Sequence, residues 1–241
     1  SFSYRLVICQ EKGICSLKDE IEKKGRLTLK ETWNVITPII SALEYAQTAF
    51  GCYHGNIKPS NIIKFKKGSK AVYKLSDFKS SDVCEKKGKK LPPAKMESLL
   101  DNEYLAPEYK FDLDGIEKEE EGKECDPFLN DVYALGILIL DCLGFEVDLL
   151  RGRKSTSIEA RTFFYRAIQL VWEIDGDTFA LLNAMLQQDP GKRCSLEVIN
   201  NFFNYPAIER KLKAQAEEYV NTKFELADLE KDIQRETTKK K

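Results

Sequence analysis

Residues 51–65 read "GCYHGNIKPSNIIKF", and this stretch decides the fold because two hydrophobic periodicities meet in it. Over residues 29–49, before it, hydrophobic side chains recur every three or four positions, which predicts a long, largely buried amphipathic helix. Over residues 61–78 two short alternating runs are joined by "KKGSK", which predicts a β-hairpin. The polar residues between them therefore lie in a loop that connects a core helix to a hairpin.

Outside this stretch the pattern is mainly helical. A β-branched and aromatic run predicts a strand at residues 4–9, and Ser16 is predicted to cap a short helix that Gly25 closes. The segment "NDVYALGILILDCL" from Asn130 is apolar on nearly all sides, which is typical of a central buried helix. Further helices are expected near residues 157–172, 177–186, 195–203 and 206–235, and charged loops near residues 80–103 and 112–126.

Composition excludes several classes of protein. The 38 basic and 39 acidic residues leave a net charge of -1, so no overall field attracts nucleic acid or an acidic membrane surface. The 7 cysteines form no C-x-x-C pair, which favours reduced thiols and a cytoplasmic location. Cys52 and the only histidine, His54, have no second pair of ligands, so no metal site is expected. The longest apolar stretch, residues 134–140, is far too short to span a membrane.

The order of these elements and motifs resembles the C-terminal lobe of a protein kinase. That family has a catalytic loop H-R-D-x-x-x-x-N, a metal-binding D-F-G and a loop terminator A-P-E. The positions in this chain that match those motifs are His54, Gly55, Asn56, Lys58, Asn61, Asp77, Phe78, Lys79, Ala106, Pro107 and Glu108.

The resemblance implies a mainly α fold: a kinase-like C-lobe with one short β-hairpin and an extended C-terminal helix. We expect the C-lobe over residues 1–205 and a helical extension over residues 206–241. The N-terminal lobe is expected to be absent from this chain, because no glycine-rich loop and no V-A-I-K lysine precede the matched motifs.

Residues with scaffold roles in the family are present. The resemblance implies that Glu108 pairs with Arg193, that Asp131 holds the backbone of the catalytic loop, and that His54 and Phe78 stack. These three interactions would keep the architecture of the lobe intact.

Residues with chemical roles are altered. Asn56 stands where the family has its catalytic aspartate, and an amide has no comparably basic oxygen, so a factor of about 10² to 10⁴ in rate should be lost. Gly55 replaces the arginine that senses a phosphorylated loop, and Lys79 replaces the D-F-G glycine. The chain is therefore expected to be a catalytically inactive pseudokinase and not an enzyme.

Three residues keep the family's ligand chemistry. Lys58 would face phosphate, and Asn61 and Asp77 would bind metal, so they are the candidates for residual ATP and Mg²⁺ binding. A single lobe would bury too little of a nucleotide for useful affinity, so no cofactor or metal is expected.

The main functional hypothesis is a scaffold or structural protein that binds other proteins, with no nucleic-acid or membrane partner. The surface facing the missing lobe is one expected contact, and the terminal helix is the other, since its residues at seven-residue spacing form a coiled-coil-like seam. These seam residues are Leu212, Tyr219, Leu226 and Ile233. A subunit of a larger assembly and a cytoskeletal association are included in this hypothesis. The alternative is the ordered part of a longer protein kinase or pseudokinase that retains ATP and Mg²⁺ binding or weak phosphotransfer.

Overall fold

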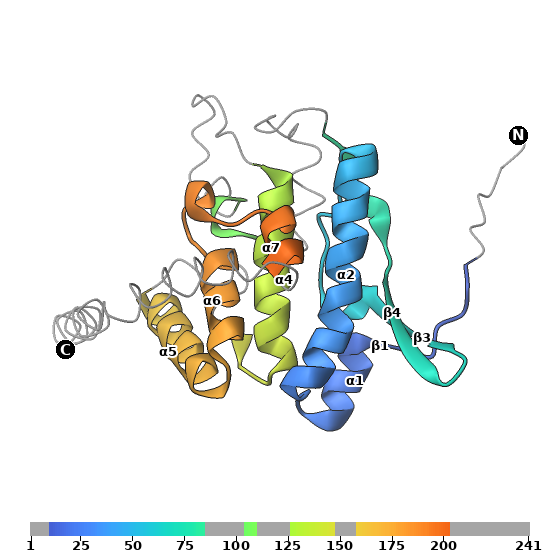
Figure 1. The fold of residues 1–241 in the computed structure, drawn as a ribbon, viewed down its shortest axis with the longest axis horizontal. Helices are drawn as coiled ribbons and strands as arrows, with labels where there is room; N and C mark the ends of the chain where they lie inside the picture. Colours follow the sequence, from blue (N-terminus) through green and yellow to red (C-terminus); the bar gives the residue numbers. More distant parts are fainter. Residues whose placement is uncertain (1–9, 85–103, 110–125, 148–157, 203–241) are drawn as a thin grey trace, which may run out of the picture.

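The computed structural model describes residues 10–84, 104–109, 126–147 and 158–202 (Figure 1). Helix α4 (Pro127–Cys142) lies at the centre of the described part, between α2 (Leu29–Phe50) and α6 (Gly176–Met185). Both neighbours contact α4, so one hydrophobic core runs through the described helices. The strand predicted at residues 4–9 and the predicted helical extension at residues 206–241 lie outside the described residues.

Helix α4 is buried on all sides, as its sequence predicts. Even its polar residues Asn130 and Asp131 are only 1% exposed. The helix begins at Pro127, before the predicted start at Asn130, because the Asp126 carboxylate accepts a hydrogen bond from the Phe128 N–H and caps it. The central position of α4 makes it the element to which the surrounding loops are fastened.

The helices α4 and α6 approach closely at Gly136. A Cβ added to this glycine would lie 2.7 Å from the Cδ2 of Leu186 and 3.3 Å from the Cβ of Met185. We expect Gly136→Ala to lower the free energy of unfolding by about 1–2 kcal/mol, because overpacking outweighs the helix propensity that alanine adds. Urea denaturation measures the loss. Gly176→Ala is the matched control, since its Cβ would meet Trp172 at an ordinary 3.4 Å; equal stability of the two variants would contradict the prediction.

The first two helices, α1 (Leu17–Lys24) and α2, both begin with a capping box. The Ser16 hydroxyl and the Asp19 carboxylate exchange hydrogen bonds with each other's backbone N–H, and Thr28 and Glu31 do the same at α2. Gly25 ends α1 with a φ of 77°, a region that favours glycine. The predicted cap and stop of this helix are confirmed.

The strands form two antiparallel sheets. One is three-stranded in the order β1 (Cys15–Ser16), β3 (Ile62–Lys67), β4 (Lys70–Leu75), and the other pairs β2 (Cys52–Tyr53) with β5 (Asp82–Val83). The predicted hairpin is present as β3 and β4, but β1 extends it to three strands and a second sheet is present, so the fold class with one short hairpin is wrong. The additional strands have two residues each, too few for an alternating pattern to mark them in the sequence.

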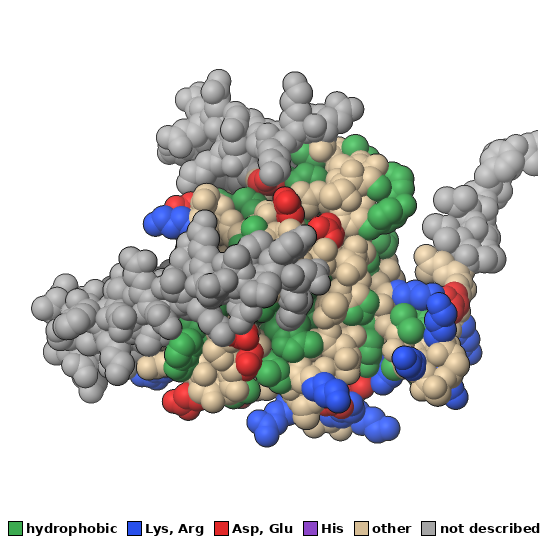
Figure 2. Space-filling view, viewed as in Figure 1, with side chains coloured by type: hydrophobic (Ala, Val, Ile, Leu, Met, Phe, Trp, Pro, Cys, Tyr) green, Lys and Arg blue, Asp and Glu red, His purple; other side chains and the backbone are tan. Residues whose placement is uncertain are grey.

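A buried carboxylate joins α1 to the hairpin. Glu20 is 7% exposed, and its oxygens accept hydrogen bonds from the Lys64 Nζ at 2.9 Å and the Tyr73 hydroxyl at 2.9 Å. Lys24 Nζ lies 3.0 Å from the same carboxylate. Burial opposes ionisation of Glu20, but the hydrogen bonds from Lys64, Lys24 and Tyr73 outweigh it and lower the pKa. The hydrogen bonds of Glu20 therefore fix the hairpin against α1. Exposed lysines cover the outer side of the hairpin (Figure 2).

The remaining helices follow the predicted order. They are α5 (Ile158–Ile174), α6 and α7 (Leu196–Phe202), and the short 3-10 helices are η1 (Pro59–Asn61), η2 (Phe78–Ser80), η3 (Pro107–Tyr109) and η7 (Pro190–Lys192). Trp172 of α5 meets Phe179 of α6 edge-to-face, with ring centroids 5.1 Å apart. In the described ranges we find no helix with the length and apolar character needed to cross a membrane.

Candidate functional site

The loop after α2 is bound to the N-terminal half of α4 by Asp131. One oxygen of this carboxylate accepts the His54 N–H at 2.7 Å and the other accepts the Gly55 N–H at 2.8 Å. Burial raises the pKa of Asp131 to about 7, and the two backbone hydrogen bonds oppose the rise. The loop backbone therefore has a fixed position relative to the core.

His54 joins this loop to the end of β4. The backbone N–H of Asn56 donates to His54 Nδ1 at 3.2 Å, so the neutral ring carries its proton on Nε2, which lies 3.1 Å from the carbonyl oxygen of Ser76. Burial lowers the pKa of His54 to about 4, which keeps the ring neutral at neutral pH. The ring also meets Phe78 edge-to-face at 4.7 Å. His54 thus acts as a bridge within the protein, with both nitrogens in use.

Three of the predicted ligand and catalytic positions converge. Asn56 Nδ2 donates to Asp77 Oδ2 at 3.1 Å, and Asn61 Nδ2 donates to the backbone oxygen of Asn56 at 2.8 Å. The two asparagines are only 4% and 7% exposed, respectively. Tertiary structure therefore brings residues from the loop, η1 and the end of the hairpin to one place.

Asp77 has an unusual backbone. Its φ and ψ are both 64°, and it is the only non-glycine residue with a positive φ among those described. Such a conformation costs free energy and recurs at functional sites, where surrounding contacts hold it. The Lys79 backbone, by contrast, lies in η2 without a positive φ, so the lysine in place of glycine causes no strain here.

Asp77 and Asn61 provide oxygen ligands of the kind that Mg²⁺ prefers. Within the described ranges no group of three or more His, Cys, Asp and Glu side chains could hold a metal ion by itself. Mg²⁺ at nucleotide sites needs no such group, because it takes one or two protein oxygens together with phosphate oxygens and water. The residues present fit a magnesium–nucleotide complex, with Lys58 nearby in sequence as a cation for phosphate.

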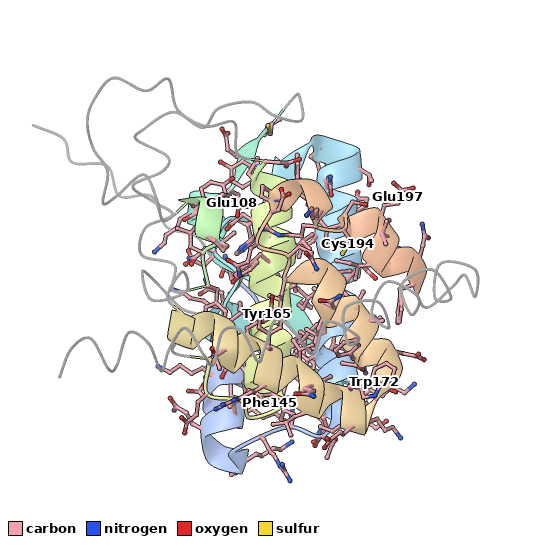
Figure 3. The ribbon with its side chains drawn as sticks, turned by 90° about the vertical axis from the view of Figure 1, so that its left-hand side faces the viewer. Glu108, Phe145, Tyr165, Trp172, Cys194 and Glu197 are labelled. Atoms are coloured by element: carbon pink, nitrogen blue, oxygen red, sulfur yellow. The ribbon has the colours of Figure 1, made fainter. Side chains whose placement is uncertain are left out.

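Arg193 and Glu108 form a bidentate ion pair. The Nη1 of Arg193 lies 2.7 Å from Oε1 of Glu108, and Nη2 lies 2.9 Å from Oε2. The guanidinium also donates to the carbonyl oxygens of Gln187 and Leu129 and lies over the ring of Tyr133. Figure 3 shows Glu108 on the short segment beside α4. The pair connects that segment to the turn that follows α6.

The sequence prediction did not include Asn130, which also holds this segment. Its Oδ1 accepts the N–H of Ala106 at 2.9 Å. The hydroxyl of Tyr104 donates to Asp141 Oδ2 at 2.5 Å, which adds a contact at the other end of α4. Polar residues on a helix that is otherwise fully apolar were the signal that could have identified Asn130, since buried polar groups need partners.

The predicted partner-binding seam was Leu212, Tyr219, Leu226 and Ile233. All four residues, and the predicted domain boundary at residue 205, lie outside the described residues. The seam, the coiled coil and the scaffold role remain predictions.

The chain is similar to a protein-family model and to curated proteins. The family model described as "Protein kinase domain" matches residues 3–203. The chain is also 29% identical over 171 residues to the serine/threonine-protein kinase CHK1 of Saccharomyces cerevisiae. The aligned part is 67% of this chain and 29% of that relative, so the chain corresponds to less than a third of the relative's length.

These matches correct two predictions. The fold class, a C-lobe alone, is wrong, because the match is to the kinase domain as such, begins at residue 3 and includes the sheet at the N-terminal end. The prediction that the chain is not an enzyme is also wrong, because the domain and a serine/threonine kinase relative both point toward a kinase. That prediction depended on Asn56, which replaces the catalytic aspartate, and on the expectation that this chain has no glycine-rich loop and no V-A-I-K lysine.

Proposed function

This chain belongs to the protein kinase family, and we propose that it is part of a kinase that binds ATP with Mg²⁺ and transfers a phosphoryl group weakly to a hydroxyl acceptor. The observation that supports this proposal is the convergence of Asn56, Asn61 and Asp77 on a loop that Asp131 holds in place. Asp77 also has a φ of 64°, a costly backbone conformation of the kind that recurs at functional sites.

The ligand roles follow from the side-chain chemistry. Asp77 offers a carboxylate of which Oδ1 has no hydrogen-bond partner among the described residues, and Asn61 offers its amide oxygen. Mg²⁺ held there would neutralise phosphate charge and orient the triphosphate. Lys58 has no acidic partner in the described part of the chain, so its ammonium is available to contact a phosphate oxygen.

Asn56 sets the low rate. Its amide can accept a hydrogen bond from the substrate hydroxyl and orient it, but it cannot take the proton as a carboxylate would. Orientation and electrostatic stabilisation supply much of the catalysis in phosphoryl transfer, so the loss of the base lowers the rate without abolishing the reaction. The relative is named a serine/threonine kinase, which supports a Ser or Thr hydroxyl as the acceptor.

Asp77→Asn tests the nucleotide site. The change keeps an oxygen that can accept from Asn56 but removes the charge that attracts Mg²⁺, so we expect the rate of phosphoryl transfer to fall about tenfold or more, because Mg²⁺ would no longer orient the triphosphate. Isothermal titration calorimetry measures the Kd, and transfer of labelled phosphate from ATP to a Ser/Thr peptide mixture measures the reaction. Glu22→Gln, which removes an exposed carboxylate of α1, is the control and should change neither. If the unaltered chain neither binds Mg–ATP nor transfers label, the proposal is overturned.

A further inference from the structure

A lysine lies beside the proposed metal-binding carboxylate. The Nζ of Lys79 is 3.8 Å from Oδ2 of Asp77, and this same oxygen accepts the hydrogen bond from Asn56. One oxygen of Asp77 is therefore already shared between an amide and an ammonium group. A divalent cation would have to compete with this ammonium for the carboxylate.

The backbone places Lys79 there. Residues 78–80 form the single turn η2, which turns the chain so that residue 79 comes back beside residue 77. The Ser81 N–H donates to the Phe78 carbonyl oxygen at 3.1 Å, and the Ser81 hydroxyl donates to the His54 carbonyl oxygen at 3.2 Å. The turn is thus anchored to the same loop as Asn56, and the lysine side chain starts from a fixed backbone.

The ammonium also remains accessible to a ligand. The side chain of Lys79 is 65% exposed, and that of Asp77 is 36% exposed. At 3.8 Å, Lys79 Nζ and Asp77 Oδ2 form an ion pair but are too far apart for a hydrogen bond. The N–H groups of this ammonium can therefore donate to other acceptors. A phosphate group beside Asp77 would meet this positive charge.

We propose that Lys79 supplies positive charge at this site in place of much of the divalent cation, so that ATP binds with little dependence on Mg²⁺. This inference rests on the proposed nucleotide site. An ammonium is a strong hydrogen-bond donor to phosphate oxygens, and it offsets the repulsion between Asp77 and the triphosphate that Mg²⁺ would otherwise offset. The glycine of the family motif could do neither.

Calorimetric titration of the full chain with ATP, once with Mg²⁺ and once with EDTA, tests the inference. For the unaltered chain the two Kd values should agree within about threefold. In Lys79→Met the Kd in EDTA should rise about tenfold or more, and Mg²⁺ should restore most of the lost affinity because Asp77 is then open to the ion. Lys79→Arg keeps the charge and should bind ATP in EDTA nearly as the unaltered chain does.

Lys67→Met is the matched control, since it removes another exposed lysine, at the end of β3, and should leave both Kd values unchanged. Binding that requires Mg²⁺ equally in the unaltered chain and in Lys79→Met would overturn the inference and leave the nucleotide site standing. Absence of ATP binding in both buffers would overturn the proposed function together with it.

Discussion

Replacing Asn56 with aspartate should raise the rate of phosphoryl transfer by about 10² to 10⁴. The new carboxylate can accept the proton of the substrate hydroxyl, which the amide cannot, and this gain equals roughly 3–5 kcal/mol of barrier. The loop needs no rearrangement to use it, because Asp131 holds the backbone N–H groups of His54 and Gly55 before residue 56, and Asn61 holds the Asn56 carbonyl oxygen after it.

The same substitution has an electrostatic consequence. Asn56 Nδ2 now donates to Asp77 Oδ2 at 3.1 Å, and Asn56→Asp would place a second carboxylate at that distance. Two carboxylates this close disfavour each other's ionisation, so we expect the variant to unfold at a lower temperature in EDTA and to recover with Mg²⁺. The rate gain should therefore require Mg²⁺ even where ATP binding does not.

Transfer of labelled phosphate under single-turnover conditions measures the gain. Asn56→Ala is the control, because it also removes the amide but introduces no base, and it should stay at or below the original rate. Asn56→Asp combined with Asp77→Asn should lose the gain. If Asn56→Asp folds normally, binds Mg–ATP and transfers label no faster than the unaltered chain, the role assigned to residue 56 is incorrect.

Arg193→Met should lower the free energy of unfolding by about 3–5 kcal/mol. The Arg193 side chain is fully buried and the Glu108 side chain is 9% exposed, so the variant leaves a carboxylate without its partner away from water. It also removes the donors to the Gln187 and Leu129 carbonyl oxygens. Breaking a buried pair from one side costs more than the pair itself contributes, because the remaining charge stays desolvated.

Thermal unfolding should show this loss as a decrease in Tm of about 6–20 °C for a chain of this size. Lys192→Met removes the neighbouring exposed cation and should change stability by less than about 0.5 kcal/mol. The double variant Glu108→Gln with Arg193→Met should recover part of the loss, which a double-mutant cycle separates from the single effects. A loss from Arg193→Met no larger than that from Lys192→Met would show that the pair contributes little.

The sequence predicted local structure correctly where a side chain interacts with residues close to it in the chain. Ser16 and Gly25 mark the ends of α1 because a cap and a left-handed stop depend on a few adjacent residues. The hairpin of β3 and β4 was readable because each strand is long enough to alternate. The sequence did not predict the pairing of Cys15 with Lys64, because this pairing joins short segments that are distant in the chain.

The members of the candidate site were also readable, by their resemblance to kinase motifs. The resemblance also predicted three contacts, namely Glu108 with Arg193, Asp131 with the loop backbone, and His54 with Phe78, but it did not predict those of Asn56 and Lys79. Nothing in the sequence indicates that Asn56 donates to Asp77, or that Lys79 comes within 3.8 Å of the same oxygen. The resemblance also led to a wrong conclusion about activity, because the altered residue was judged by its own chemistry without the residues around it.

The sequence by itself determined the helices, the hairpin and the kinase-type residues, since propensity, capping and periodicity act over a few neighbouring positions. The pair of Glu108 with Arg193 followed from the resemblance, but only the tertiary structure decided that Glu20 meets Lys64 and that Lys79 meets Asp77. Electrostatic and hydrogen-bond energies depend on distance and burial, and both are set only when elements remote in the chain pack against α4 and the hairpin.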